Sequence, residues 1–290
     1  TGIPLRVKPA KLMGRGGGFV IAALLALLAF VGSVSDAAAA FPNGYSFRRL
    51  IDIADAQVSS GPHTNFPILF STTTLAEELK TTLKTTANGG KVTDAEGDDI
   101  IFTDSDGTTQ LAHEVEKYTA TTGELIAWVR LPSLASTSTI YIYYGNSAVT
   151  TFQGNVTSNG VTGVWDTFFK GVWHLKENPL GTPPQMKDST SNAKDGTSAG
   201  APAQVAGKIG EAVSFNGLAG SVDSVSNASF AGVAGFPFTI STWTAATTGN
   251  SGSFRGAATL GFSNTQYFGV GWSSSLADGT PRTSGRNTTF

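Results

Sequence analysis

The sequence predicts an all-β fold: two β-sandwich domains preceded by an N-terminal signal-peptide helix. Charged residues make up 14% of the 290 residues, against about 25% in average soluble domains, and Thr, Ser, Gly and Ala take their place. Sheet surfaces carry Thr, Ser and Tyr where helix surfaces carry Glu, Lys and Arg. The 35 Gly and 12 Pro fit many tight turns between short strands.

Residues 1–40 predict a signal peptide. Basic residues precede an apolar run at residues 19–30, which is shorter than the ~20 residues that span a bilayer. Ala38, Ala39 and Ala40 supply the small residues that signal peptidases need, so we expect cleavage before Phe41. An uncleaved membrane anchor is the alternative. Either way, the protein is expected outside the cytoplasm: in the periplasm, on the cell surface or secreted.

Residues 41–146 predict the first sandwich. Short apolar stretches indicate strands at residues 47–53, 65–70, 99–102, 111–118, 125–131 and 139–144. Pro67 favours a sheet edge, because proline cannot donate a hydrogen bond to a neighbouring strand. Residues 104–107 predict a hairpin turn. Residues 74–83 carry Leu at every fourth position and predict a short amphipathic helix.

Residues 147–163 are polar and contain Gly, which indicates a linker. Residues 164–290 predict a second sandwich. Its expected strands lie at residues 171–175, 210–215, 236–243 and 267–272, with a turn at 188–192. Because the pattern stops at Phe290, we expect this domain to be incomplete.

Two sets of motifs resemble known families. The first resembles the bacterial domain of unknown function 2341, in the stretches 45–53, 98–107, 128–133 and 140–146. The second resembles laminin G-like, concanavalin A-like jelly rolls, in the stretches 171–175, 188–192, 207–217 and 238–243. That resemblance implies a fold, not a function, because such folds serve lectins, glycanases and adhesion modules. The pairing is common in exported bacterial proteins, some of which continue into a membrane part resembling proton-channel proteins.

The laminin G-like resemblance implies a calcium site at one rim. Asp188, Asn192 and Asn216 stand at the matching turn positions, and Ca²⁺ takes six to eight oxygen ligands, including backbone carbonyls. Many members carry two Asp after the Phe-x-Gly turn, where this chain has Leu, Ala and Gly at residues 218–220. The alternative is that Asp188 and Asn192 only brace a turn. No other cofactor is predicted.

The sequence lacks the residues that several classes of function require. The formal net charge is −2 and the part after residue 40 has no basic patch, so no nucleic-acid partner is expected. Without cysteine, disulfides and thiolate metal sites are excluded. Neither His-x-x-x-His nor Gly-x-Ser-x-Gly occurs. The acidic residues Asp94, Glu96, Asp98 and Asp99 do not match an EF-hand and are interpreted as solvated loop charge.

A glycanase would need two carboxylates about 5–9 Å apart in one cleft. Glu114 and Glu116 lie at i and i+2, and alternation places them with Tyr118 on one face, opposite His113, Val115 and Lys117. We interpret the pair as surface charges and predict no catalytic residue. Sugar-stacking candidates are Trp165, Trp173, Trp243, Tyr267 and Trp272, although core packing is expected for Trp173 and Trp243.

The sequence therefore predicts a non-catalytic, exported binding or adhesion module, with a glycan or a cell-surface molecule as partner. A membrane is involved only through the export signal or through a region beyond Phe290. One alternative is the periplasmic structural part of a larger envelope complex with a proton-channel-like membrane part. The other is a polysaccharide-active glycoside hydrolase.

Overall fold

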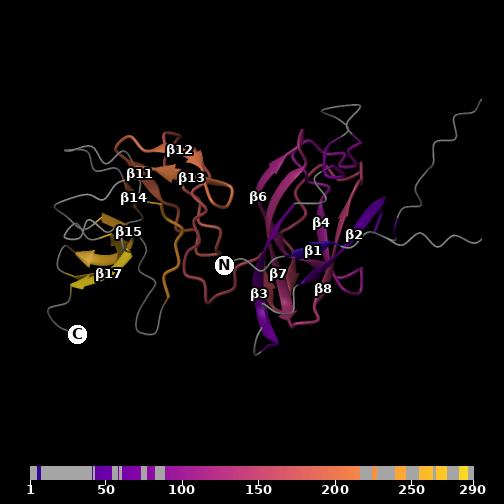
Figure 1. Cartoon of the computed structure of the whole chain (residues 1–290), viewed down its shortest axis with the longest axis horizontal. Coiled ribbons are helices and arrows are strands. Elements are labelled where there is room, and N and C mark those ends of the chain that lie inside the picture. Colours follow the sequence, from indigo (N-terminus) through magenta and orange to yellow (C-terminus); the bar gives the residue numbers. More distant parts are fainter. Residues whose placement is uncertain are drawn as a thin grey trace, which may run out of the picture. The chain divides into compact units, whose positions relative to one another are not determined.

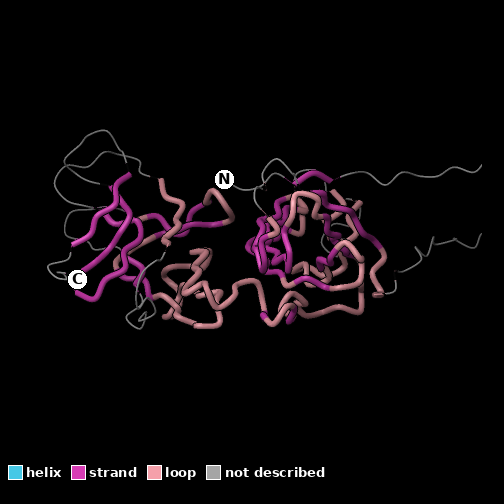
Figure 2. Tube along the Cα trace, turned by 90° about the horizontal axis from the view of Figure 1, so that it is seen from below, coloured by secondary structure: helices cyan, strands magenta, loops and turns pink. Residues whose placement is uncertain are grey.

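The computed structural model describes residues 5–7, 41, 43–53, 58, 61–72, 77–81, 89–215, 224–226, 239–245, 255–263, 266–272 and 281–286. Within these residues every regular element is a β-strand, all strands pair antiparallel, and there is no helix (Figures 1 and 2). The all-β prediction is confirmed. The same residues accordingly contain no helix that could cross a membrane. The chain forms two compact units, Thr1–Phe230 and Ala231–Phe290.

Two sheets form the main body of the first unit (Figure 1). The five-stranded sheet runs in the order β1 (Leu5–Val7), β2 (Phe47–Ile53), β8 (Thr139–Tyr144), β4 (Ile101–Asp104) and β5 (Gln110–Leu111). The three-stranded sheet runs in the order β3 (His63–Ser71), β7 (Glu124–Leu134) and β6 (His113–Thr119). Pro67 lies on β3, an edge strand, as predicted. Apart from β1, which pairs with β2, the predicted signal peptide lies outside the described residues.

The remaining strands are short or belong to the second unit. In the first unit, β9 (Thr157–Ser158) pairs with β10 (Val161–Thr162), β11 (Thr197–Ala199) with β14 (Ser224–Ser226), and β12 (Ala203–Ala206) with β13 (Glu211–Ser214). In the second unit, β15 (Arg255–Ser263), β16 (Gln266–Trp272) and β17 (Pro281–Arg286) form one antiparallel sheet. The strand predicted at 267–272 is β16. The strand predicted at 236–243 is absent from its described part, residues 239–243.

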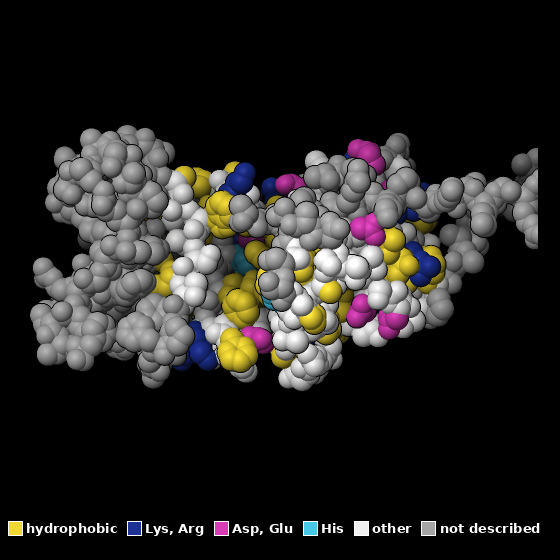
Figure 3. Space-filling view, turned by 60° about the horizontal axis from the view of Figure 1, so that its bottom comes forward, with side chains coloured by type: hydrophobic (Ala, Val, Ile, Leu, Met, Phe, Trp, Pro, Cys, Tyr) yellow, Lys and Arg dark blue, Asp and Glu magenta, His cyan; other side chains and the backbone are white. Residues whose placement is uncertain are grey.

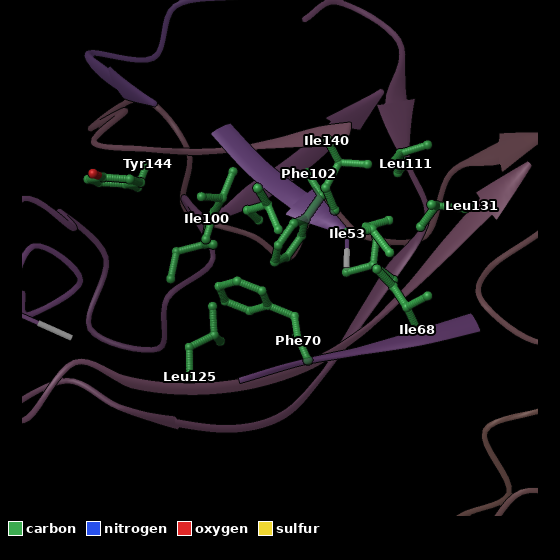
Figure 4. Packing of buried hydrophobic residues seen from close by; sticks show 14 of the residues in the cluster. Ile53, Ile68, Phe70, Ile100, Phe102, Leu111, Leu125, Leu131, Ile140 and Tyr144 are labelled. Carbon is green, nitrogen blue, oxygen red and sulfur yellow. The ribbon is translucent and has the colours of Figure 1, made fainter. Parts of the chain in front are cut away.

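The two large sheets share one hydrophobic core (Figure 4). Strand alternation directs Ile51 and Ile53 of β2 and Ile140 of β8 inward, where they meet Ile68 and Phe70 of β3. Phe70 and Phe102 pack edge to face with ring centroids 5.2 Å apart. Burying each side chain of this size contributes about 1.5–3 kcal/mol, so this core is the main source of stability for the two layers.

The described part of the segment predicted to be helical forms a turn instead. Its described part, residues 77–81, contains a turn and an isolated bridge between Thr81 and Val92. Lys91 N–H donates to the Glu78 carbonyl and Val92 N–H to the Lys80 carbonyl. These bonds join the turn to residues 91 and 92, and this tertiary pairing overrides the local leucine spacing. The leucine spacing still buries Leu79 completely.

A β-bulge at Glu116 changes the alternation of β6. Val115 pairs with Ala127 of β7 and Lys117 with Ile126, so Glu116 is an extra residue. Glu114 and Glu116 both lie on the outer face, as predicted. Beyond the bulge the alternation is reversed, and Tyr118 packs against the core. The prediction that Tyr118 shares a face with the two glutamates is wrong for this reason.

Arg130 fastens the predicted linker to the three-stranded sheet. The side chain is completely buried on β7. Its Nε donates to the Gly163 carbonyl at 2.8 Å, its Nη2 to the Val161 carbonyl at 2.8 Å, and its Nη1 to Asn65 Oδ1 at 3.0 Å. Residues 147–163 thus contain the β9–β10 hairpin and are bound along β7.

Asp99 is completely buried. Its carboxylate accepts hydrogen bonds from Thr93 N–H (2.9 Å) and Asp94 N–H (3.2 Å), and from Gly145 and Asn146 N–H (3.1 Å each). The interpretation as solvated loop charge is therefore wrong for Asp99, which joins the loop before β4 to the turn after β8.

We predict that Asp99→Ala lowers the free energy of unfolding by about 3 kcal/mol, because several buried N–H donors lose their acceptor. Glu96→Ala, in the exposed part of the same loop, should change it by less than about 0.5 kcal/mol. Urea unfolding of both variants measures the difference, and equal effects would contradict the structural role of Asp99.

Candidate functional site

A buried ionic cluster lies on the outer face of the three-stranded sheet. Glu114 and Glu116 point outward from β6, and Trp128 of β7 pairs with Glu114 in the strand register. The other members follow the sheet in sequence: Trp165, His174 and Ser189. We call these six residues the His174 cluster. It joins the segment 165–189 to the sheet.

His174 lies between the two carboxylates. Its Nε2 is 2.7 Å from Glu114 Oε1, and its Nδ1 is 2.6 Å from Glu116 Oε2. The contact at Nε2 is an ion pair without the alignment of a hydrogen bond. The side chains of His174 and Glu116 are 8% and 2% exposed, and that of Glu114 is 21% exposed. Burial on this scale makes charged groups costly unless an opposite charge is in contact, and His174 contacts both carboxylates.

Neutral donors bind the same carboxylates. Trp128 Nε1 donates to Glu116 Oε2 at 2.9 Å, and Trp165 Nε1 donates to Glu114 Oε2 at 2.9 Å. Ser189 Oγ donates to Glu114 Oε1 at 2.7 Å. The two indole rings lie 5.3 Å apart, and the His174 ring is 6.0 Å from Trp165. Aromatic rings thus shield the ion pairs from water, which strengthens the electrostatic attraction between them.

The cluster favours the cationic form of His174 and the anionic form of Glu114. Burial alone would lower the pKa of His174, but Glu114 and Glu116 outweigh it and raise the pKa to about 9. Burial alone would raise the pKa of Glu114, but His174, Ser189 and Trp165 hold it below its usual value. His174 is therefore an imidazolium at neutral pH.

His113 shows the opposite behaviour on the core side of the same strand. Its ring packs between Phe102 and Phe152, with centroids 5.3 and 5.2 Å away. Burial lowers the pKa of His113 to about 4, although hydrogen bonds to the Leu111 and Ile100 backbone oppose the shift. The two histidines differ because only His174 has carboxylates as neighbours.

The arrangement suits holding the segment 165–189 on the sheet better than it suits proton transfer. Ser189 donates to the carboxylate of Glu114 and not to His174, whereas the serine of a hydrolase triad is bonded to its histidine. A general base at neutral pH works best with a pKa near 7, and His174 lies well above it. The interpretation of Glu114 and Glu116 as surface charges is wrong, because donors from the segment 165–189 cover them.

The predicted calcium ligands are only partly within the described residues. Asp188 accepts hydrogen bonds from the N–H groups of Val172 and Thr190 at 3.0 Å each and of Lys194 at 2.9 Å. Asn192 Nδ2 donates to the Lys170 carbonyl at 3.2 Å. In this geometry both side chains brace a turn.

Asn216 lies outside the described residues. In the part of the chain that is described, no three His, Cys, Asp or Glu side chains group as a metal site. Calcium binding stays a prediction.

The aromatic candidates are scattered. Trp165 belongs to the His174 cluster and is 7% exposed. Trp173 Nε1 donates to the Lys194 carbonyl. In place of the strand predicted at 171–175, Trp173 forms one isolated bridge with Asp188. Trp243 is 61% exposed, so its expected core packing is wrong. The side chains of Tyr267 and Trp272 lie outside the described ones.

Residues 96–174 match the family model described as Domain of unknown function (DUF2341). This segment is a DUF2341 domain. The match begins and ends later than the resemblance expected at 41–146, and it includes Glu114, Glu116 and His174. No curated protein and no solved structure matches the chain. These comparisons give no support for a laminin G-like domain after the DUF2341 domain.

We predict that the contribution of His174 to stability depends on pH. The raised pKa makes this contribution complete below about pH 6.5, and it is lost as pH rises through about 9. The corresponding loss in the free energy of unfolding is about 3 kcal/mol. Urea unfolding of wild type and His174→Gln should therefore differ most near pH 6 and least near pH 10.

Lys208→Gln is the control, since it removes a positive charge from an exposed position. Its effect should stay below about 0.5 kcal/mol. A His174→Gln effect of the same size at both pH values would contradict the ion-pair assignment.

Proposed function

We propose that the protein is an exported, non-catalytic binding or adhesion module whose partner is a glycan or another cell-surface molecule. The signal-peptide pattern of residues 1–40 supports a place outside the cytoplasm. The layered antiparallel sheets support a binding role, because such scaffolds present ligand surfaces on their faces and loops.

The observation that carries the proposal is the state of the Glu114 and Glu116 carboxylates. A glycosidase needs one carboxyl group to protonate the leaving oxygen and a second to act as nucleophile or base. Here an imidazolium lies between the pair, and Trp128, Trp165 and Ser189 donate to their oxygens. The pair that alternation brings to one face is engaged inside the protein.

The domain architecture is part of the same proposal. We infer that the two sheets around the shared core form one β-sandwich domain. We also infer that residues 164–290 belong to a laminin G-like jelly roll; the motifs at 207–217 and 238–243 and the antiparallel β15–β16–β17 sheet support this. A calcium ion bound by Asp188, Asn192 and Asn216 belongs to this jelly-roll proposal.

Retention of the protein on immobilised polysaccharides, with Ca²⁺ and with a chelator, tests the function. We predict retention on at least one polymer and no release of reducing ends from any of them. Glu114→Gln, if it remains folded, should be retained as well as wild type. Polysaccharide hydrolysis by wild type that Glu114→Gln abolishes would overturn the proposal, and so would failure to bind any polymer.

A further inference from the structure

A cationic side chain is held between aromatic rings on the outer face of the five-stranded sheet. Arg48 of β2 has its Cζ 4.6 Å from the ring centroid of Phe41 and 4.6 Å from that of Tyr141, with Tyr143 at 5.9 Å. We call these four residues the Arg48 clamp. Figure 3 shows basic side chains lying against hydrophobic ones on the surface. Cation–π contacts of this kind fix the plane of the guanidinium.

One hydrogen bond orients the guanidinium further. Arg48 Nη1 donates to Tyr143 Oη at 3.1 Å, and Tyr143 Oη donates to the Gly107 carbonyl at 2.8 Å. Tyr143 itself is 1% exposed, so it is a rigid support. Phe41, Arg48 and Tyr141 are each partly exposed. The clamp is therefore ordered and still reachable from solvent.

The charge of Arg48 has no acidic partner among the described residues: no carboxylate there forms an ion pair with it, and its one hydrogen bond goes to Tyr143. The turn that contains Gly107 carries two acids, but both bond inside that turn. Asp106 accepts from the N–H groups of Thr108 and Thr109 at 2.8 Å, and Asp104 accepts from Ser105 N–H at 2.6 Å. Among the residues that the structure describes, most N–H donors of Arg48 therefore have no acceptor.

Gly107 lets the turn approach the guanidinium closely. It has a φ of 72°, and an added Cβ would lie 3.2 Å from Arg48 Nη1 and 3.1 Å from Tyr143 Oη. A larger residue would therefore crowd the clamp and would be strained at this φ. The turn approaches Arg48 closely and adds no side chain of its own.

We propose that the Arg48 clamp binds the carboxylate of an acidic sugar, of the hexuronate class, within a polysaccharide. The free N–H groups of Arg48 match a carboxylate in a paired, planar geometry. The partly exposed Tyr141 ring offers an apolar face to the sugar ring beside that carboxylate. A neutral sugar would leave the cation unpaired. The inference rests on the proposed binding function and names its ligand class.

Retention on polygalacturonate tests the inference, with the same polymer reduced at its carboxyl groups as the neutral probe. Wild type should be retained on the acidic polymer at least about tenfold more tightly than on the reduced one. Arg48→Gln should lose about tenfold or more, and Arg48→Lys should recover part of the loss, because an ammonium keeps the charge but not the planar fork. Lys208→Gln is the charge-matched control and should bind as wild type.

Tyr143→Phe covers the case in which Arg48→Gln does not fold. It retains the ring and removes the hydroxyl that orients Arg48 and donates to the Gly107 carbonyl. We therefore expect a lower unfolding midpoint and, under conditions where the variant is folded, retention several-fold weaker than wild type. Equal retention of Arg48→Gln and Lys208→Gln would overturn the inference, as would equal retention on polyglutamate, which offers carboxylates without a sugar. Retention only on neutral polymers would overturn it but leave the proposed function standing, whereas no retention on any polymer would overturn both.

Discussion

In the first unit two carboxylates are buried on one face of a strand, and they require a neighbouring cation. The segment that packs on that face supplies it. An unpaired buried carboxylate costs several kcal/mol. Alternation along β6 brings Glu114 and Glu116 together on the outer face, and His174 supplies a positive charge between them. The segment that carries His174 must therefore stay on the sheet.

This constraint explains why the DUF2341 domain reaches beyond its last long strand. The matched region continues for thirty residues past β8, from Tyr144 to His174 (174 − 144 = 30). Over that stretch Arg130 binds the carbonyls around the β9–β10 hairpin, and Trp165 then covers Glu114. These polar contacts hold the chain to the outer face of the sheet, on the side away from the shared core.

The two sheets use charge in opposite ways on their outer faces. In the His174 cluster, charges and donors are paired with one another and little capacity remains for a ligand. In the Arg48 clamp, aromatic rings hold a cation most of whose donors have no acceptor in the described part of the chain. For the proposed binding role the two features would act together, since a rigid scaffold lowers the entropic cost of presenting a charged group to a partner.

Much of the fold can be predicted from local sequence patterns, whereas the His174 cluster cannot. Alternation defines β2 and β8 at their observed bounds, because each strand has one face in the core. The bulge at Glu116 depends on how β7 pairs, and the Leu spacing around Leu79 misleads because residues 91 and 92 bond the backbone there. His174 lies 60 residues from Glu114 (174 − 114 = 60), so no local pattern links them.

An NMR titration of the histidine ring protons tests the ion-paired His174 most directly, with His174→Gln identifying the resonance. The account predicts that His174 titrates near pH 9 because of Glu114 and Glu116, while the buried His113 titrates near pH 4. A pKa of His174 at or below 6.5 would show that the two carboxylates do not hold it as a cation, and would contradict the account.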